Sequence, residues 1–89
     1  MNTCVIITIS GRVQGVGFRY FLLHQARKLD IKGFAKNLPD GSVYVEAEGS
    51  REMLDVFIEF CKTGPMRARV DKFELQNCPK QGFKEFRIS

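Results

Sequence analysis

A glycine-rich stretch that ends in an arginine is the part of this sequence best suited to chemistry. Residues 11–19 read Gly-Arg-Val-Gln-Gly-Val-Gly-Phe-Arg and lie between a strand-like segment and the first turn of a helical one. The N–H groups at a helix start lack partners within the helix, and glycines let several of them converge on one anion. Arg19 can add a bidentate, permanently charged guanidinium. The stretch indicates a phosphate-binding loop, although in isolation a plain glycine-rich turn with a solvated arginine fits equally well.

Asn37 is a second residue suited to chemistry. It stands directly before Leu-Pro-Asp-Gly, a sequence typical of a tight turn between two strands. Its amide carbonyl can accept a hydrogen bond from water while its NH₂ group donates nearby, and neither group changes charge with pH. Taken alone, such an asparagine is more simply interpreted as a polar residue that enters a turn.

Two better-known glycine motifs are excluded. A nucleotide P-loop requires Gly-Lys-Ser or Gly-Lys-Thr, and the sequence contains neither. Gly15 and Gly17 could begin a dinucleotide-binding fingerprint, but Tyr20 stands where its third glycine is required.

The single histidine, His24, is predicted at the surface of the helix. Because no cluster of His, Cys and carboxylate residues accompanies the loop, we expect no metal and no cofactor.

The hydrophobic pattern predicts the elements that position these residues. Alternating segments predict strands at 4–10, 31–38, 43–48, about 69–76 and 83–88. A helical stripe begins at Phe18, and a second helix follows Ser50 as its N-cap and stops at Gly64-Pro65. This order is typical of the α+β class, in the form of a ferredoxin-like split βαβ sandwich. We therefore expect an antiparallel sheet of about five strands with two helices on one face.

Length and composition limit the remaining possibilities. The 89 residues, 44% of them hydrophobic, predict a single domain over residues 1–89, and the net charge of +4 favours anionic partners. No apolar run is long enough to span a membrane, and no leader segment is evident. Cys4, Cys61 and Cys78 are odd in number and form no Cys-x-x-Cys pair. We expect reduced cysteines with packing or loop roles, in a cytoplasmic protein.

Two segments resemble the signatures of the acylphosphatase family. Residues 11–19 are similar to the first, G-x-V-Q-G-V-x-[FM]-R, at every specified position. Residues 33–49 are similar to the second, G-[FYW]-[AVC]-[KRQAM]-N-x-x-x-G-x-V-x-x-x-x-x-G, again without a departure. The rest of the chain is similar to the family in length and in the order of its elements. The resemblance implies a metal-independent hydrolase of acyl phosphates that needs no cofactor.

The resemblance also implies roles for individual residues. Arg19 would bind the phosphoryl oxygens together with backbone N–H groups of the loop, and Asn37 would orient the attacking water. The implied loop comprises Gln14, Gly15, Val16, Gly17, Phe18 and Arg19. The carboxylate that leaves has a conjugate acid with a pKa of about 4, so expelling it requires no general acid. The expected partners are small acyl phosphates and inorganic phosphate, bound by a monomer that contacts neither nucleic acid nor membrane.

Three other interpretations stay open. An RNA-recognition module has the same element order, and residues 32–35 match the start of its motif, but Lys36 and Leu38 stand where stacking side chains should continue. Hydrogenase-maturation proteins that handle carbamoyl phosphate begin with an acylphosphatase-like domain, but their zinc-binding and transfer regions are not in these 89 residues. A non-catalytic phosphate-binding protein would require only the loop.

Overall fold

The computed structural model describes residues 2–89, and its elements follow the predicted order. The elements are β1 (Asn2–Arg12), α1 (Phe18–Lys28), β2 (Lys32–Asn37), β3 (Val43–Ser50), α2 (Arg51–Thr63), β4 (Arg69–Cys78) and β5 (Phe86–Ile88). The last strand is shorter than expected, because residues 79–85 form an irregular connection from β4 to β5. We call residues 79–85 the crossover segment. No helix in the described part of the chain is long and apolar enough to cross a bilayer.

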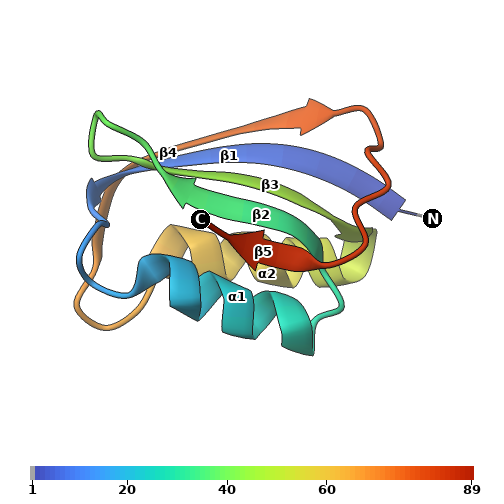
Figure 1. The fold of residues 1–89 in the computed structure, drawn as a ribbon, viewed down its shortest axis with the longest axis horizontal. Coiled ribbons are helices and arrows are strands. Elements are labelled where there is room, and N and C mark those ends of the chain that lie inside the picture. Colours follow the sequence, from blue (N-terminus) through green and yellow to red (C-terminus); the bar gives the residue numbers. More distant parts are fainter. Residues whose placement is uncertain (1) are drawn as a thin grey trace.

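The five strands form one sheet in the order β4-β1-β3-β2-β5, and both helices cover the same face of it (Figure 1). β1 pairs antiparallel with β3 and β4, and β2 pairs antiparallel with β3. β5, however, pairs parallel with β2, so the sheet is mixed and the expectation of a fully antiparallel sheet is wrong for this strand. β4 ends at the end of the sheet where β2 begins. The chain therefore crosses that end and enters β5 in the direction of β2.

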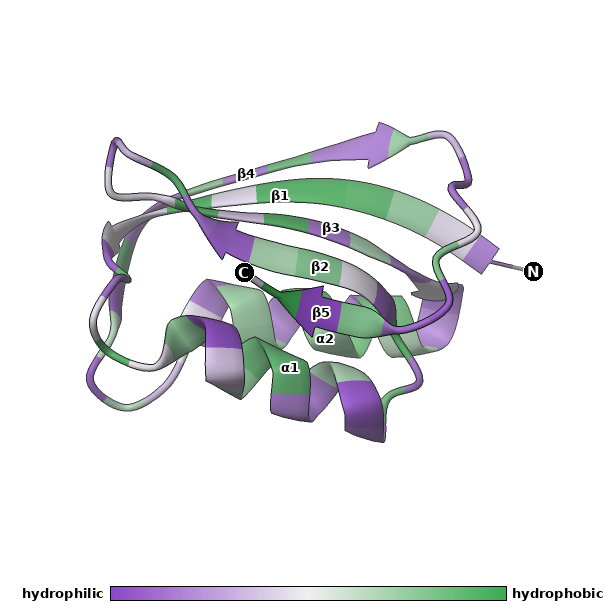
Figure 2. Ribbon diagram, in the orientation of Figure 1, coloured by the Kyte–Doolittle hydropathy of each residue, from purple (hydrophilic) through white to green (hydrophobic). Residues whose placement is uncertain are grey.

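The hydrophobic core lies between the sheet and the two helices. β1 and β3 direct alternate residues into it, so that Ile7 and Val45, which pair in register, are both fully buried. Leu22 of α1 and Phe57 of α2 cover them from the helical layer. Figure 2 shows the corresponding colours, with a largely hydrophobic β1 and helices that alternate between hydrophobic and hydrophilic residues. Burial of this apolar surface fixes where the end of β1 meets the start of α1.

The two helices begin differently, and the difference bears on the site. α2 begins after Ser50, whose hydroxyl accepts a hydrogen bond from the N–H of Met53 at 3.3 Å, as the sequence predicts. α1 begins after Gly17, which has a left-handed backbone (φ 78°), and no side chain of residues 2–89 caps it. The first N–H groups of α1 are therefore available to a ligand.

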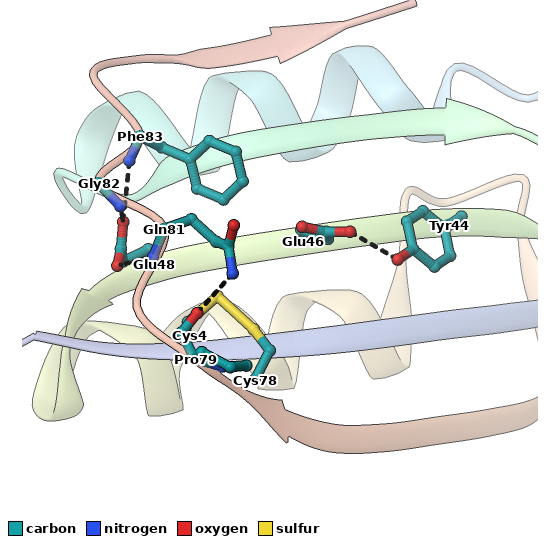
Figure 3. The surroundings of a disulfide bond; sticks show 9 residues. All are labelled: Cys4, Tyr44, Glu46, Glu48, Cys78, Pro79, Gln81, Gly82 and Phe83. Atoms are coloured by element: carbon teal, nitrogen blue, oxygen red, sulfur yellow. Dashed lines mark hydrogen bonds between the residues drawn. A yellow bond between two sulfur atoms is a disulfide. The ribbon is translucent and has the colours of Figure 1, made fainter.

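The expectation of reduced cysteines is wrong for two of the three. Cys4 of β1 and Cys78 of β4 form a disulfide (Figure 3). They are 74 positions apart in the sequence but directly opposite each other in the pairing of the two strands, with Cα atoms 5.2 Å apart. Cysteine spacing could not reveal the pair because it depends on which strands are neighbours. Cys61 packs in the core as predicted, and burial raises the pKa of its thiol.

The crossover segment passes over the sheet face opposite the helices and is held there by a buried carboxylate. Glu48 of β3 is only 2% exposed. Its two oxygens accept hydrogen bonds from the N–H groups of Gln81, Gly82 and Phe83, each at 3.0 Å (Figure 3). The ring of Phe83 packs edge-on against Phe34 of β2. These contacts guide the chain from β4 to the opposite edge of the sheet.

Candidate active site

The loop between β1 and α1 curls as the glycine pattern predicts. Gly15 and Gly17 both have positive φ angles, 73° and 78°. A Cβ atom at either position would meet no atom within 4 Å, so the glycines are required by the backbone conformation and not by crowding. The loop lies at the end of the sheet where β1 stops and α1 starts (Figure 1).

A cavity of about 110 Å³ lies against this loop and brings the two predicted site regions together. Its lining residues are Val13, Gln14, Gly15, Gly17, Phe18, Arg19, Tyr20 and Asn37. Arg19 and Asn37, which are 18 positions apart, therefore face one space. Val16, which the sequence places in the loop, instead packs its side chain against the hydrophobic core.

The guanidinium of Arg19 is held at the cavity by the last residue of the sequence. Its Nη1 atom donates a hydrogen bond to the main-chain oxygen of Ser89. Ser89 is itself fixed beside β2, because its N–H donates to the carbonyl of Ala35 at 3.1 Å. A guanidinium has five N–H donors, so others stay available for an anion in the cavity. Sequence reasoning missed Ser89, since only the parallel pairing of β5 with β2 brings it near the loop.

Asn37 lies at the last position of β2, where the strand enters the turn to β3. It is half-buried, and its side-chain amide makes no hydrogen bond to any of residues 2–89. The amide therefore faces the cavity with its donors and acceptor free, which suits it to hold a water molecule or a ligand oxygen.

Gln14 joins the loop to the turn that follows Asn37. Its Nε2 atom donates hydrogen bonds to the carbonyls of Leu38 and Ser42, at 2.9 and 3.0 Å. The side chain therefore holds the glycine-rich loop at a fixed distance from the turn that follows Asn37. The sequence places Gln14 in the loop but gives no sign of this contact, because its partners are main-chain atoms 24 and 28 positions away.

The turn itself is fixed by Asp40. Its carboxylate accepts hydrogen bonds from the N–H and the hydroxyl of Ser42, at 2.9 and 2.6 Å, and these bonds lower the pKa of Asp40 below its usual value. The N–H of Leu38 donates to the carbonyl of Ser42 at 2.9 Å. The predicted Pro-Asp-Gly turn is thus confirmed, and it sets the position of Asn37.

The charges around the cavity favour an anion. Arg19 and the N-terminus of α1 are both positive, and the first turn of α1 carries no acidic residue. His24 lies exposed on α1, as predicted, and is not among the lining residues. The described residues contain no group of three or more His, Cys, Asp or Glu side chains placed to hold a metal ion.

The aromatic residues on the open sheet face bear on the alternative of RNA binding. The ring of Phe34 lies 5.9 Å from that of Phe83 and 6.0 Å from that of Tyr44, measured between centroids. The ammonium group of Lys36 lies 5.9 Å from the same ring. Phe34 is therefore half-buried among its neighbours, whereas a stacking platform requires a free ring face.

Fold and site together define a small ferredoxin-like α+β protein with a glycine-rich loop and an arginine beside one cavity, and comparisons with known proteins assign its family. The acylphosphatase family profile matches residues 5–88. The acylphosphatase of Archaeoglobus fulgidus is 46% identical over 83 residues, which cover 93% of each chain. The chain therefore belongs to the acylphosphatase family and has acylphosphatase activity.

Two solved structures have closely similar folds. The acylphosphatase of Bacillus subtilis superposes with a TM-score of 0.94 and is 37% identical, covering 100% of this chain and 99% of that one. Full-length HypF, in its phosphate- and nucleotide-bound form, superposes with a TM-score of 0.90 and is 29% identical, but the match covers only 12% of that chain. The chain is thus similar in extent to the small acylphosphatases and to one part of a much larger protein.

Proposed function

We propose that this protein hydrolyses acyl phosphates to a carboxylate and inorganic phosphate, without a metal ion, by attack of water on phosphorus in the cavity beside Arg19. The observation that carries the proposal is that Arg19, Asn37 and the uncapped start of α1 border one space. These groups are of the kinds that bind a phosphoryl group and a water molecule.

Arg19 and the loop form the phosphoryl-binding half of the proposed site. The N–H groups of residues 15–19 and the guanidinium surround the three non-bridging oxygens. Phosphoryl transfer proceeds through a loose transition state with charge spread over these oxygens, so positioned donors stabilise it more than the ground state. Gln14, Gly15, Val16, Gly17 and Phe18 contribute mainly through the backbone that carries these donors.

Asn37 holds the nucleophile in the proposed reaction. Its amide binds a water molecule in line with the bond from phosphorus to the carboxyl oxygen. A bond forms between the water oxygen and phosphorus while the bond to the carboxyl oxygen breaks, and that oxygen leaves with the electron pair as a carboxylate. The water proton passes to the product phosphate or to solvent. Because a carboxylate is a good leaving group, the site needs no acid to protonate it.

Loss of benzoyl phosphate absorbance, followed in excess chelator, tests this function. Wild type should turn over the substrate, and Arg19→Ala should lose at least about 3 kcal/mol of transition-state stabilisation, a loss of more than a hundredfold in kcat/KM. Arg27→Ala is the matched control, since Arg27 is an exposed arginine in the last turn of the same helix. A strict requirement for a metal ion, or equal rates for wild type and Arg19→Ala, would contradict the proposal.

We also propose that the protein acts as a monomer on small-molecule acyl phosphates, with inorganic phosphate as a competing ligand and no nucleic acid or membrane partner. The size of the cavity supports a small phosphoryl compound. The cytoplasmic location stays a prediction, and the Cys4–Cys78 disulfide is of a kind that oxidising compartments favour.

A further inference from the structure

We propose that Tyr20 determines the acyl specificity of this site, by placing its ring against the acyl group and favouring acyl phosphates whose acyl group is aromatic. The proposal rests on the proposed function, because it takes the cavity beside Arg19 as the phosphoryl site. It concerns the other half of the substrate, which neither Arg19 nor Asn37 contacts.

The phosphoryl group and the acyl group of a substrate would lie in different parts of the proposed site. Arg19 and the N–H groups of the loop would hold the phosphoryl group at the start of α1. The acyl group would then extend over the rim of the cavity, where it contacts the exposed side chains of the lining residues.

Tyr20 is the lining residue that offers an apolar surface at this rim. It is 66% exposed, whereas Val13 and Phe18 are buried in the core. Gly15 and Gly17 have no side chain, and that of Gln14 is bound to the turn.

The ring of Tyr20 is free to meet a ligand. It packs against no other aromatic ring of residues 2–89, and its hydroxyl makes no hydrogen bond to them. Tyr20 follows Arg19 directly in the first turn of α1, so the helix that presents the guanidinium also places the tyrosine beside the cavity. An exposed aromatic ring beside an anion site suits a ligand that has a charged head and an aromatic body.

Two substrates with the same phosphoryl group separate this role from phosphate binding. Benzoyl phosphate carries a ring next to the carboxyl carbon, and acetyl phosphate carries a methyl group. We expect Tyr20→Ala to lower kcat/KM for benzoyl phosphate about threefold to tenfold more than for acetyl phosphate. Tyr20→Phe keeps the ring and should stay within about twofold of wild type on both substrates.

Three controls make the result specific. Inhibition by inorganic phosphate should be unchanged in Tyr20→Ala, since the phosphoryl half is intact. Met53→Ala removes another partly exposed apolar side chain, on α2, and should leave both substrates unaffected. Tyr20→Gln, which also favours a helix, should reproduce the selective loss of Tyr20→Ala and serves if the alanine variant folds poorly.

Equal losses on the two substrates, no loss on either, or the same selective loss in Tyr20→Phe would overturn the proposal. Its failure is distinguishable from failure of the proposed function. If only the role of Tyr20 is wrong, wild type still hydrolyses acyl phosphates and Arg19→Ala does not. If the proposed function is wrong, wild type and Arg19→Ala have equal rates.

Discussion

Arg19 and Asn37 reach the cavity from different elements, and main-chain atoms hold each of them in place. Arg19 projects from the first turn of α1 and donates to the carbonyl oxygen of Ser89. Asn37 is the last residue of β2, and the turn that follows it is held by Gln14, whose side-chain amide donates hydrogen bonds to two carbonyls of the turn. The two candidate site residues are thus fixed relative to each other by hydrogen bonds between segments that are distant in the sequence. Such bracing limits the entropy that positioning would otherwise cost.

We expect Asn37→Ala to lower kcat on the order of a hundredfold, because the attacking water loses the group that orients it. Inhibition by inorganic phosphate should change less than about twofold, since Arg19 and the loop still bind the phosphoryl oxygens. Steady-state kinetics with phosphate as a competitive inhibitor checks both values. Asn77→Ala, at an exposed position of β4, is the matched control. Near-normal turnover by Asn37→Ala would mean that another group positions the water.

At the scale of single residues, the sequence predicted which side chains come together but not how they are supported. Motif resemblance was sufficient to pair Arg19 with Asn37, and the structure lines one cavity with both. The supporting contacts of Gln14 and Ser89 could not be predicted, because both are side-chain bonds to main-chain oxygens of distant segments. A backbone carbonyl carries no sequence signal, since every residue has one.

Among the elements, the crossover segment is where the sequence prediction was wrong, because it placed residues 83–85 in a strand. Three of its backbone N–H groups donate instead to the carboxylate of Glu48. Glu48 lies on the sheet face opposite the helices, where the crossover segment buries it. A carboxylate that accepts three N–H bonds acts as an anchor for an otherwise irregular chain.

Removing the charge of that anchor should destabilise the protein. Glu48→Gln replaces one acceptor oxygen by an NH₂ group, which cannot accept a hydrogen bond from the crossover segment. We expect the free energy of unfolding in urea to fall by at least about 2 kcal/mol. Tm should fall by about 8 °C or more.

Glu46→Gln provides the matched control for this measurement. Glu46 lies on the same strand face, but among residues 2–89 its carboxylate accepts a hydrogen bond only from the hydroxyl of Tyr44, at 2.6 Å. A glutamine carbonyl can still accept that bond, so we expect a loss below about 1 kcal/mol. Equal losses in the two variants would show that Glu48 does not anchor the crossover segment.

For the whole molecule, the sheet separates the candidate site from the disulfide. The loop of residues 14–19 lies where β1 ends, whereas Cys4 is near the start of β1 and Cys78 is the last residue of β4. The sequence predicted the helices, the order of the elements and the layer arrangement from periodicity alone. It could not predict the parallel placement of β5 or the disulfide. Both depend on which strands become neighbours, and a local pattern does not encode that.

The disulfide should therefore contribute to stability and not to catalysis. It closes a loop with a sequence separation of 74, and the chain-entropy relation gives about 4 kcal/mol of stabilisation for a loop of this length. We expect dithiothreitol to lower Tm by more than about 15 °C. Because the site lies at the other end of β1, kcat/KM at 25 °C should be unchanged while the reduced protein stays folded. Thermal unfolding and turnover, each measured with and without reductant, check the two expectations.

Cys78→Ser and thiol counting make this test decisive. The variant should unfold at the lower temperature of the reduced wild type and should not respond to dithiothreitol, since it has no disulfide to lose. Alkylation of the denatured wild type should label one thiol without reductant, that of Cys61, and three thiols after reduction. Three labelled thiols without reductant would show that Cys4 and Cys78 are not joined. A fall in kcat/KM on reduction, with the fold intact, would show that the two ends of the sheet are coupled.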